Sequence, residues 1–152
     1  MVNSILNKIK DVFEVKEVKY YCEEEKGRIG ANFFDSVMMF HVEPDMVTYK
    51  MVFKGDVPEE KRKDVREYLN DINCILKEGH MEMDDDGTVT FRISVDMSEE
   101  PEMSEYRLLS IMGKGVHAED TFHGGIKHIV EGNMEPRKAF KDALYAVRKR
   151  NA

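Results

Sequence analysis

Three histidines and two acids that could bind a metal ion or transfer protons lie in one short segment. They are His117, Glu119, Asp120, His123 and His128. Imidazole ligates metals and exchanges protons near neutral pH. In a helix, however, His117 and His128 would lie about 16 Å apart along the axis, and His123 would point to nearly the opposite side. We therefore predict no metal site here, and expect solvated or structural histidines, with Glu119 or Asp120 pairing with His123 at the helix surface.

The segment Glu82–Gly87 resembles the start of a calcium loop. Oxygen-bearing side chains stand at its first, third and fifth positions, and a glycine stands at the sixth. An EF-hand also needs a bidentate Glu at the twelfth position. That position is Ile93, inside an alternating apolar pattern. The segment is therefore predicted to be a hairpin turn.

Other catalytic patterns are absent from the sequence. Gly113-Lys114-Gly115 lacks the spacer and the following Ser or Thr of a phosphate loop. There is no serine nucleophile elbow and no paired carboxylates in a recognisable setting. Cys22 and Cys74 are too few and too far apart for a disulfide framework or a zinc site, and are expected to be core thiols. We predict a non-enzymatic protein with no catalytic residue, cofactor or metal, and keep an enzyme of unrecognised type as an alternative.

Charge is distributed unevenly along the chain. The net charge of -7 repels phosphate backbones on average and opposes nucleic-acid binding. The region 135–152 is different because it carries many cations: Arg137, Lys138, Lys141, Arg148, Lys149 and Arg150. Only Phe140 and Tyr145 could stack on bases there. A solvated basic helix is the favoured interpretation of 135–152, and a nucleic-acid-linked regulator that uses this helix is the alternative.

Length and composition are typical of one globular domain. The chain has 152 residues, of which 41% are hydrophobic and 35% charged, so we expect a single domain over 1–152. No stretch approaches the ~18 continuous apolar residues that cross a bilayer. The first fifteen residues mix charged side chains into apolar positions, unlike a secretory signal. We therefore expect a cytoplasmic protein with no membrane partner.

Apolar spacing predicts the elements at the start of the chain. A spacing of three and four over 2–13 predicts a helix, capped by Asn3 or Ser4. Alternation over 18–22 predicts a strand. The next stretch, 28–34, could be a strand or irregular, because it contains a glycine and is too short for a helix of its own.

The middle of the chain combines a hairpin and a helix. Apolar residues alternate over 38–53 on both sides of a turn at Pro44-Asp45, which predicts a β-hairpin. A helix is predicted from Pro58, since acidic residues follow it and favour a helix N-terminus. Gly79 is the expected terminator.

The last part of the chain predicts another hairpin and two helices. The hairpin covers 81–97, and its clean alternation indicates a sheet with one buried and one wet face. A long helix over 108–130 should kink or break near Gly113 or Gly124, because glycine weakens helices. A short final helix begins at Pro136.

The methionines divide into two sets. Those on predicted buried faces are Met38, Met51 and Met97. Those off the buried faces are Met39, Met46, Met103 and Met134. Flexible thioether side chains can form adaptable binding surfaces, so the second set could be exposed for a partner, although most methionines should be core.

The order of elements and the residues of the central region resemble the YbjN family, bacterial proteins described as candidate sensory transduction regulators with the fold of type III secretion chaperones. The residues that carry the resemblance are Val57-Pro58-Glu59-Glu60, Tyr68-Leu69-Asn70, Asn73, Gly79, Met81, Glu82, Asp84 and the strand from Val89 to Val95. The glycines between Gly113 and Gly125 and the basic tail depart from the family pattern. The resemblance implies an α+β fold of order α-β-β-β-α-β-β-α(-α), dimerisation and no enzymatic activity.

Two docking modes are available to such a fold. An exposed strand edge can accept an extended peptide through backbone hydrogen bonds, and apolar patches can receive its side chains. We therefore expect a protein-binding regulator or chaperone-like module. Its partners would be a protein of unknown identity and a second copy of the chain.

Overall fold

The computed structural model describes residues 2–99 and 102–151. Its elements are α1 (Val2–Val15), β1 (Tyr21–Glu23), η1 (Glu24–Lys26), β2 (Arg28–Phe33), β3 (Ser36–Val42), β4 (Met46–Phe53), η2 (Glu59–Lys61), α2 (Arg62–Asn73), β5 (His80–Met83), β6 (Val89–Asp96), α3 (Glu105–Gly132) and α4 (Pro136–Asn151). The strands form one antiparallel sheet in the order β1-β2-β3-β4-β6-β5. The predicted α+β class is confirmed. One more strand than expected precedes α2, because the ambiguous stretch 28–34 contains β2.

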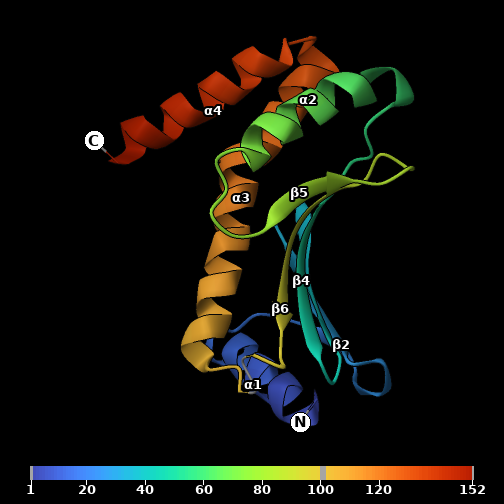
Figure 1. The fold of residues 1–152 in the computed structure, drawn as a ribbon, viewed down its shortest axis with the longest axis vertical. Coiled ribbons are helices and arrows are strands. Elements are labelled where there is room, and N and C mark those ends of the chain that lie inside the picture. The colour runs from blue at the N-terminus through green and yellow to red at the C-terminus, as the bar shows by residue number, and fades with distance from the viewer. Residues whose placement is uncertain (1, 100–101, 152) are drawn as a thin grey trace.

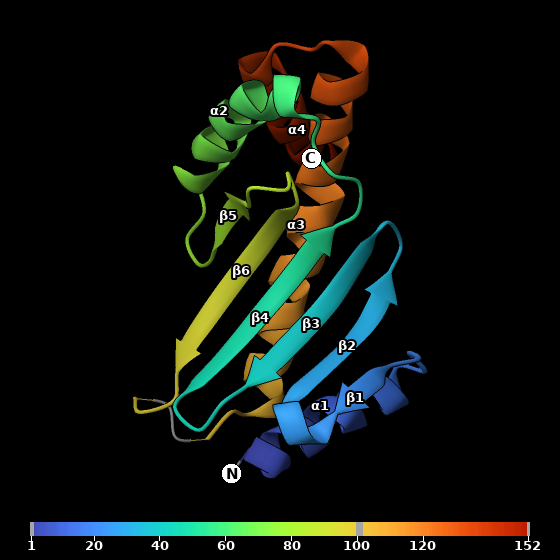
Figure 2. The ribbon, with the colours of Figure 1, turned by 90° about the vertical axis from the view of Figure 1, so that its right-hand side faces the viewer.

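The sheet has one covered face and one open face. α3 crosses the covered face, α1 lies at one end of the sheet, and α2 and α4 lie together at the other end (Figure 1). No helix of the described chain covers the opposite face, here called the open face (Figure 2). Along β3 and β4 burial alternates: Phe40, Tyr49 and Met51 are fully buried, whereas Met39 and Lys50 are partly exposed. Because successive side chains of a strand point to opposite faces of the sheet, the apolar residues of β3 and β4 face α3, as the alternating sequence pattern predicted.

α1 closes the lower end of the core with one face. Its apolar residues at helical spacing are buried: Ile5, Leu6, Ile9, Val12 and Phe13. The helix already includes Val2, which packs against the core, so Asn3 and Ser4 lie inside the helix. The predicted cap is therefore wrong.

α3 runs unbroken through all its glycines. It has 28 residues and begins at Glu105, after the N-cap residue Ser104, whose side chain accepts a hydrogen bond from the Arg107 N–H. The predicted kink or break near Gly113 or Gly124 is wrong. A Cβ at either glycine would meet only open space, so no close contact at these positions forces the helix to bend. An exposed helical glycine costs about 1 kcal/mol, and packing of the opposite face of α3 outweighs that cost.

Two other glycines let α3 approach two buried tyrosines. A Cβ on Gly115 would lie 2.0 Å from the hydroxyl oxygen of Tyr49, and a Cβ on Gly125 would lie 2.1 Å from that of Tyr68. The Tyr68 hydroxyl donates to the Phe122 carbonyl at 2.8 Å. The buried Tyr49 hydroxyl has no hydrogen-bond partner among the described residues. Burial raises the pKa of both phenols, and each ring is held where only a glycine leaves room for it.

The end of α2 and the cysteines differ from the prediction. A 3-10 turn precedes α2, which ends at Asn73 rather than continuing to Gly79. The chain must reverse to enter β5, and Gly79 makes that bend with a φ of +79°. Cys74, just beyond α2, is exposed, so its prediction as a core thiol is wrong. Cys22 is partly buried and packs against the core. None of the described helices is long and apolar enough to cross a bilayer.

The tyrosine contacts predict opposite effects for two glycines of α3. Gly115→Ala should lower the free energy of unfolding by roughly 1–3 kcal/mol, because the methyl group overpacks against the rigid Tyr49 ring. Gly124→Ala is the matched control and should raise it by up to about 1 kcal/mol, because its methyl group meets open space and favours the helix. Urea unfolding followed by circular dichroism measures both. Equal effects of the two substitutions would contradict this account of how α3 is seated.

A salt-bridge cluster fixes the loop before β5 to α3. The Glu78 carboxylate accepts hydrogen bonds from Arg107 Nη1 at 2.9 Å and Nη2 at 2.7 Å, and from Lys114 Nζ at 2.6 Å. Arg107, and then Lys114, lower the pKa of Glu78 to about 2 against the opposing effect of burial. The two parallel hydrogen bonds from Arg107 fix the orientation of the Glu78 carboxylate and also stabilise its negative charge.

The lowered pKa of Glu78 predicts an acid-sensitive contribution to stability. The unfolded carboxyl protonates near its ordinary pKa of about 4.3, whereas the folded carboxyl stays ionised down to about pH 2. The contribution is therefore complete above about pH 5 and disappears as the pH falls to about 2. Glu78→Gln should lose roughly 1–2 kcal/mol at pH 7 and flatten the fall in acid. Urea titrations between pH 7 and pH 3, with exposed Glu67→Gln as control, measure this; identical pH profiles for all three proteins would disprove it.

Candidate functional site

The edge of the sheet at β5 is capped at one residue, Met81, by a side chain of α2. The Asn73 side chain accepts from the Met81 N–H at 2.7 Å and donates to the Met81 carbonyl at 3.0 Å. It thus bonds to the backbone as a neighbouring strand would. Because Met81 is the second of the four residues of β5, a partner peptide could pair along the full strand only after displacing Asn73.

The edge at β2 is only half covered. β1 pairs with Arg28, Ile29 and Gly30, so Ala31–Phe33 has a strand neighbour on the β3 side alone. The Gly27 carbonyl accepts from the Val42 N–H, on the β3 side. The backbone N–H and C=O groups of successive residues in an antiparallel strand point alternately to one side and to the other. Gly27 points toward β3, so the N–H and C=O of Asn32, five residues later, point away from β3. No backbone partner meets them in the described part of the chain, and the end of β2 is an open strand edge.

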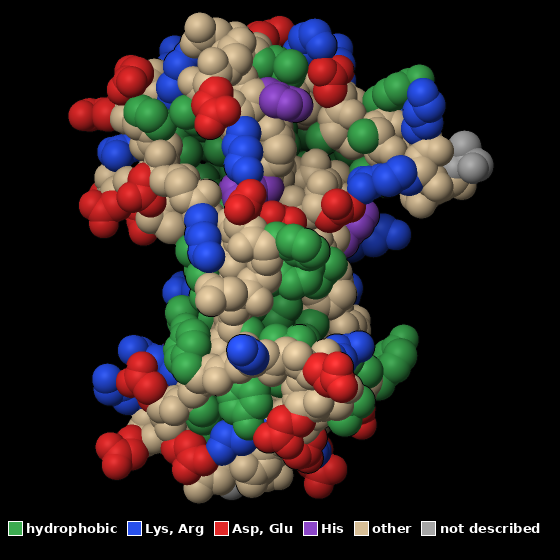
Figure 3. All heavy atoms as spheres, turned by 180° about the vertical axis from the view of Figure 1, so that it is seen from behind, with side chains coloured by type: hydrophobic (Ala, Val, Ile, Leu, Met, Phe, Trp, Pro, Cys, Tyr) green, Lys and Arg blue, Asp and Glu red, His purple; other side chains and the backbone are tan. Residues whose placement is uncertain are grey.

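An apolar groove lies beside this open edge, between β2 and the first half of α3. We call it the α3 groove, a hollow of about 460 Å³ lined by Phe13, Lys16, Val18, Ala31, Asn32, Phe33, Met38, Leu109, Met112, Gly113 and Val116. Lys16 and Asn32 are the polar members of this lining. Seen from behind, hydrophobic side chains gather at the narrow middle of the molecule between charged ends (Figure 3). The α3 groove can therefore accept apolar side chains from a segment lying along β2.

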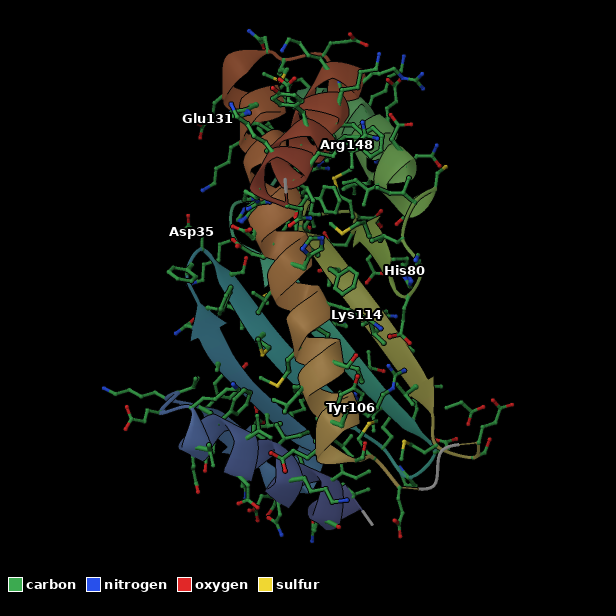
Figure 4. All side chains as sticks on the ribbon, turned by 90° about the vertical axis from the view of Figure 1, so that its left-hand side faces the viewer. Asp35, His80, Tyr106, Lys114, Glu131 and Arg148 are labelled. Carbon is green, nitrogen blue, oxygen red and sulfur yellow. The ribbon has the colours of Figure 1, made fainter. Side chains whose placement is uncertain are left out.

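A second hollow continues the groove past the β2–β3 turn. It measures about 510 Å³ and shares Phe33, Gly113 and Val116 with the α3 groove. Phe34 in the turn is 84% exposed and has a φ of +50°, an unusual conformation for an aromatic residue. Asp35 of the same turn and His80 of β5 lie on opposite sides of α3 (Figure 4). The groove and its extension thus occupy one flank of α3, the flank away from β5.

His123 is buried beneath this extension rather than solvated. Its Nδ1 lies 3.0 Å from Glu119 Oε1, its Nε2 lies 3.2 Å from the Lys54 carbonyl, and its ring stacks on Phe53 with centroids 4.7 Å apart. The predicted Glu119 pair exists, but its prediction as a surface contact is wrong, because α3 turns this face toward β4. Ser36 Oγ also approaches Glu119 at 3.5 Å. The cluster holds α3 to the ends of β3 and β4 and is structural.

Of the other candidate chemical residues, His117 and Asp120 line the extension of the groove together with Glu119, whereas His128 is not part of its lining. His117 and His128 are exposed on α3. Within 2–99 and 102–151, no three His, Cys, Asp or Glu side chains are grouped as metal ligands. Asp84 Oδ1 accepts from the N–H groups of Asp86 and Thr88 at 2.9 Å, which makes Glu82–Gly87 the hairpin turn that was predicted.

The basic tail is partly neutralised by acids of its own chain. Arg137 lies 3.7 Å from Asp71 of α2, Lys138 lies 2.8 Å from Asp142, and Arg150 pairs with Asp120 of α3. The Arg137 and Arg150 contacts hold α4 against α2 and α3, the Lys138 pair lies within α4, and all three reduce the charge that α4 presents. The favoured interpretation, a basic helix with a solvated face, agrees with this geometry.

The methionines follow the predicted division with one exception. Met38, Met51 and Met97 are buried as expected. Met39, Met46 and Met134 are partly exposed. Met103 is fully buried, so its prediction as an exposed residue is wrong. The Met103 carbonyl accepts from Lys8 Nζ at 3.0 Å, which places the start of α3 against α1.

Comparison with known proteins shows the fold. No protein-family model matches the sequence, and no curated protein matches it. Among solved structures, the chain is similar to YbjN from E. coli, a proposed transcription regulator, with a TM-score of 0.58 at 10% identity over 86% of this chain and 94% of that chain. The chain has the fold of YbjN. It is also similar to the Yersinia pestis type III secretion chaperone SycH, solved with a fragment of YscM2, with a TM-score of 0.46 at 11% identity over 72% of this chain and 92% of that chain.

The YbjN-like fold forms its groove from residues that sequence patterns did not single out. Three groove residues of α3 follow the same apolar spacing as its core residues: Leu109, Met112 and Val116. The spacing alone therefore could not show that they line a groove. The one available signal was the stretch 28–34, whose ambiguous pattern contains the half-paired strand β2. The open edge of β2 depends on where β1 ends, which is set by the register between β1 and β2.

The Asn73 contacts predict that this residue protects the β5 edge of the YbjN-like sheet. Asn73→Ala leaves the Met81 N–H and C=O without a partner and should cost roughly 1–3 kcal/mol of unfolding free energy. Faster hydrogen exchange at the Met81 amide and a concentration-dependent rise in molar mass should accompany the loss. Asn70→Ala, on exposed α2 surface one turn earlier, is the control. If both variants behave alike in exchange and molar mass, the protective role of Asn73 is wrong.

Proposed function

We propose that this YbjN-like chain is a non-enzymatic protein-binding module that adds an extended partner segment to β2 and receives its side chains in the α3 groove. The supporting observation is that the open strand edge and the groove share residues. Ala31, Asn32 and Phe33 form the open strand edge and also line the groove. A single extended segment could therefore use both.

The backbone of β2 supplies the first part of the recognition. The outward N–H and C=O of Asn32 can form a pair of hydrogen bonds with a partner strand, as in strand addition to a sheet. Main-chain bonds of this kind tolerate many sequences. They would give affinity for an extended conformation with little selection of side chains.

The α3 groove supplies the second part. Alternate side chains of an extended segment point to the same side, so residues two apart would enter the groove together. Leu109 is 37% exposed and Val116 is partly exposed, which leaves apolar surface to be covered. Burial of such surface is worth roughly 25 cal/mol per Å². The groove should therefore select apolar residues at alternate positions.

The opposite edge directs the partner to β2. At β5, the Asn73 side chain is hydrogen-bonded to the backbone N–H and C=O of Met81. The backbone of Asn32 has no such partner on its outer side in the described structure. Short and capped edges are a known protection against unwanted strand pairing. The asymmetry between the two edges supports a single peptide site per chain, and the homodimer implied by the family resemblance would have to leave it accessible.

The proposal predicts that peptide binding depends on one backbone N–H. Extended peptides with alternating apolar residues, selected from a random twelve-residue library, should bind the wild type and lose at least about tenfold in affinity to Asn32→Pro, because proline cannot donate. Asn32→Ala keeps the N–H and should bind as the wild type does. Fluorescence anisotropy measures the affinities, and circular dichroism verifies the fold of each variant.

A second pair of variants tests the α3 groove. Val116→Glu places a charge in the groove and should abolish binding, whereas Tyr106→Glu, at an 83% exposed position of α3 outside the groove, should not. Selected peptides that bind Asn32→Pro and Val116→Glu as tightly as the wild type would overturn the proposal, as would a library that yields no binder.

A further inference from the structure

The open face of the sheet places two cations side by side. Lys50 of β4 and Arg92 of β6 are direct cross-strand neighbours. Like charges in this relation destabilise a sheet. The other neighbours of Lys50 on this face are Met39 across the β3 pairing and Thr48 and Val52 along β4. No carboxylate of the described strands therefore stands next to Lys50 in the strand pairing. The Lys50 amine forms no ion pair with any other described residue.

A hollow lies over these cations and spreads across neighbouring strands. It measures about 390 Å³, and its polar lining is Arg28, His41, Glu43, Thr48, Lys50 and Arg92. Three permanent cations thus face one carboxylate. The side chains come from β2, β3, β4 and β6, with Glu43 just after β3, so the rigid sheet fixes their spacing rather than a loop.

Nearby acids are engaged at the margins of the hollow. Glu82 lies 3.3 Å from Arg92 Nε through Oε1 and 3.2 Å from His80 Nε2 through Oε2. Glu23 stands opposite Arg28 in the pairing of β1 with β2, and its carboxylate lies 2.8 Å from Lys26 Nζ. These contacts orient Arg92 and balance Arg28. They leave Lys50 as the uncompensated charge at the centre.

We propose that this hollow binds a phosphate-bearing ligand of nucleotide size, with Lys50 and Arg92 as its phosphate contacts. A phosphate group carries charge enough to offset both cations, and its oxygens fit the fork of a guanidinium. Thr48 adds a hydroxyl donor beside them. The volume lies within the roughly 300–1,000 Å³ of small-molecule sites. This ligand site is on the face opposite the α3 groove and does not depend on the protein-binding proposal.

The surroundings of the hollow favour a small ligand over a nucleic-acid strand. Along the open face, Val37 and Val52 lie beyond Lys50 in one direction, and Asp96 lies beyond it in the other. A strand of nucleic acid needs a track of cations along its backbone. The cations here line a single hollow instead.

The site is tested on the full chain with inorganic pyrophosphate and with adenosine monophosphate as probes. Amide shifts in nuclear magnetic resonance should be confined to β2, β3, β4 and β6 around the hollow. Calorimetry should show that Lys50→Met weakens binding at least about tenfold, because it removes a charge-assisted contact. Lys63→Gln removes one charge from exposed α2 and should change the affinity less than twofold.

The unliganded variants provide a second measurement. Lys50→Met relieves the like-charge pair, so its melting temperature without ligand should equal or exceed that of the wild type. Pyrophosphate should raise the melting temperatures of the wild type and Lys63→Gln alike, and that of Lys50→Met less. The proposal is overturned if neither probe binds, if Lys50→Met and Lys63→Gln weaken binding equally, or if the shifts fall outside the open face. Binding of a poly-glutamate peptide in place of both phosphate probes would also overturn it, in favour of an acidic polypeptide.

Discussion

The contact of α3 with two buried tyrosines organises the molecule. Tyr49 rises from the centre of the sheet and Tyr68 from α2, and both are fully buried. Each ring fits under α3 only because Gly115 and Gly125 carry no side chain. A helix held this close to β4 covers the middle of one sheet face and leaves the opposite face open. The edge of β2 also stays open over Ala31–Phe33, because β1 pairs only with Arg28–Gly30.

This arrangement gives the two faces different chemistry. On the α3 side, the groove beside β2 is apolar, and its one open strand edge suits an extended polypeptide. On the open face, the hollow over Lys50 and Arg92 is lined by cations and suits an anion. The sheet lies between them, so a ligand on one face and a peptide at the edge of the other could be bound together. Glu78 and the His123 cluster stabilise α3 on its two flanks and take no part in either site.

Strong periodic patterns in the sequence predicted most of the elements correctly. The hairpin over 38–53 and the strand within 81–97 follow from alternation, since a sheet with one covered face requires it. The failures have local causes. The glycines of α3 argued for a kink, but two of them accommodate tyrosine rings from distant segments. Cys74 and Met103 were misplaced because burial at the end of a helix or in a loop depends on what packs there.

The sequence by itself determined the fold class, the order of the elements apart from β2, and the absence of recognisable catalytic motifs, because these depend on residue type and on spacing within short segments. Tertiary structure alone decided which strand edge stays open, where the apolar groove lies and which cations meet on the open face. Those features join residues far apart in the chain: Val18 and Val116 in the groove, Lys50 and Arg92 on the sheet. Their proximity arises from strand register and helix packing, which no local pattern specifies.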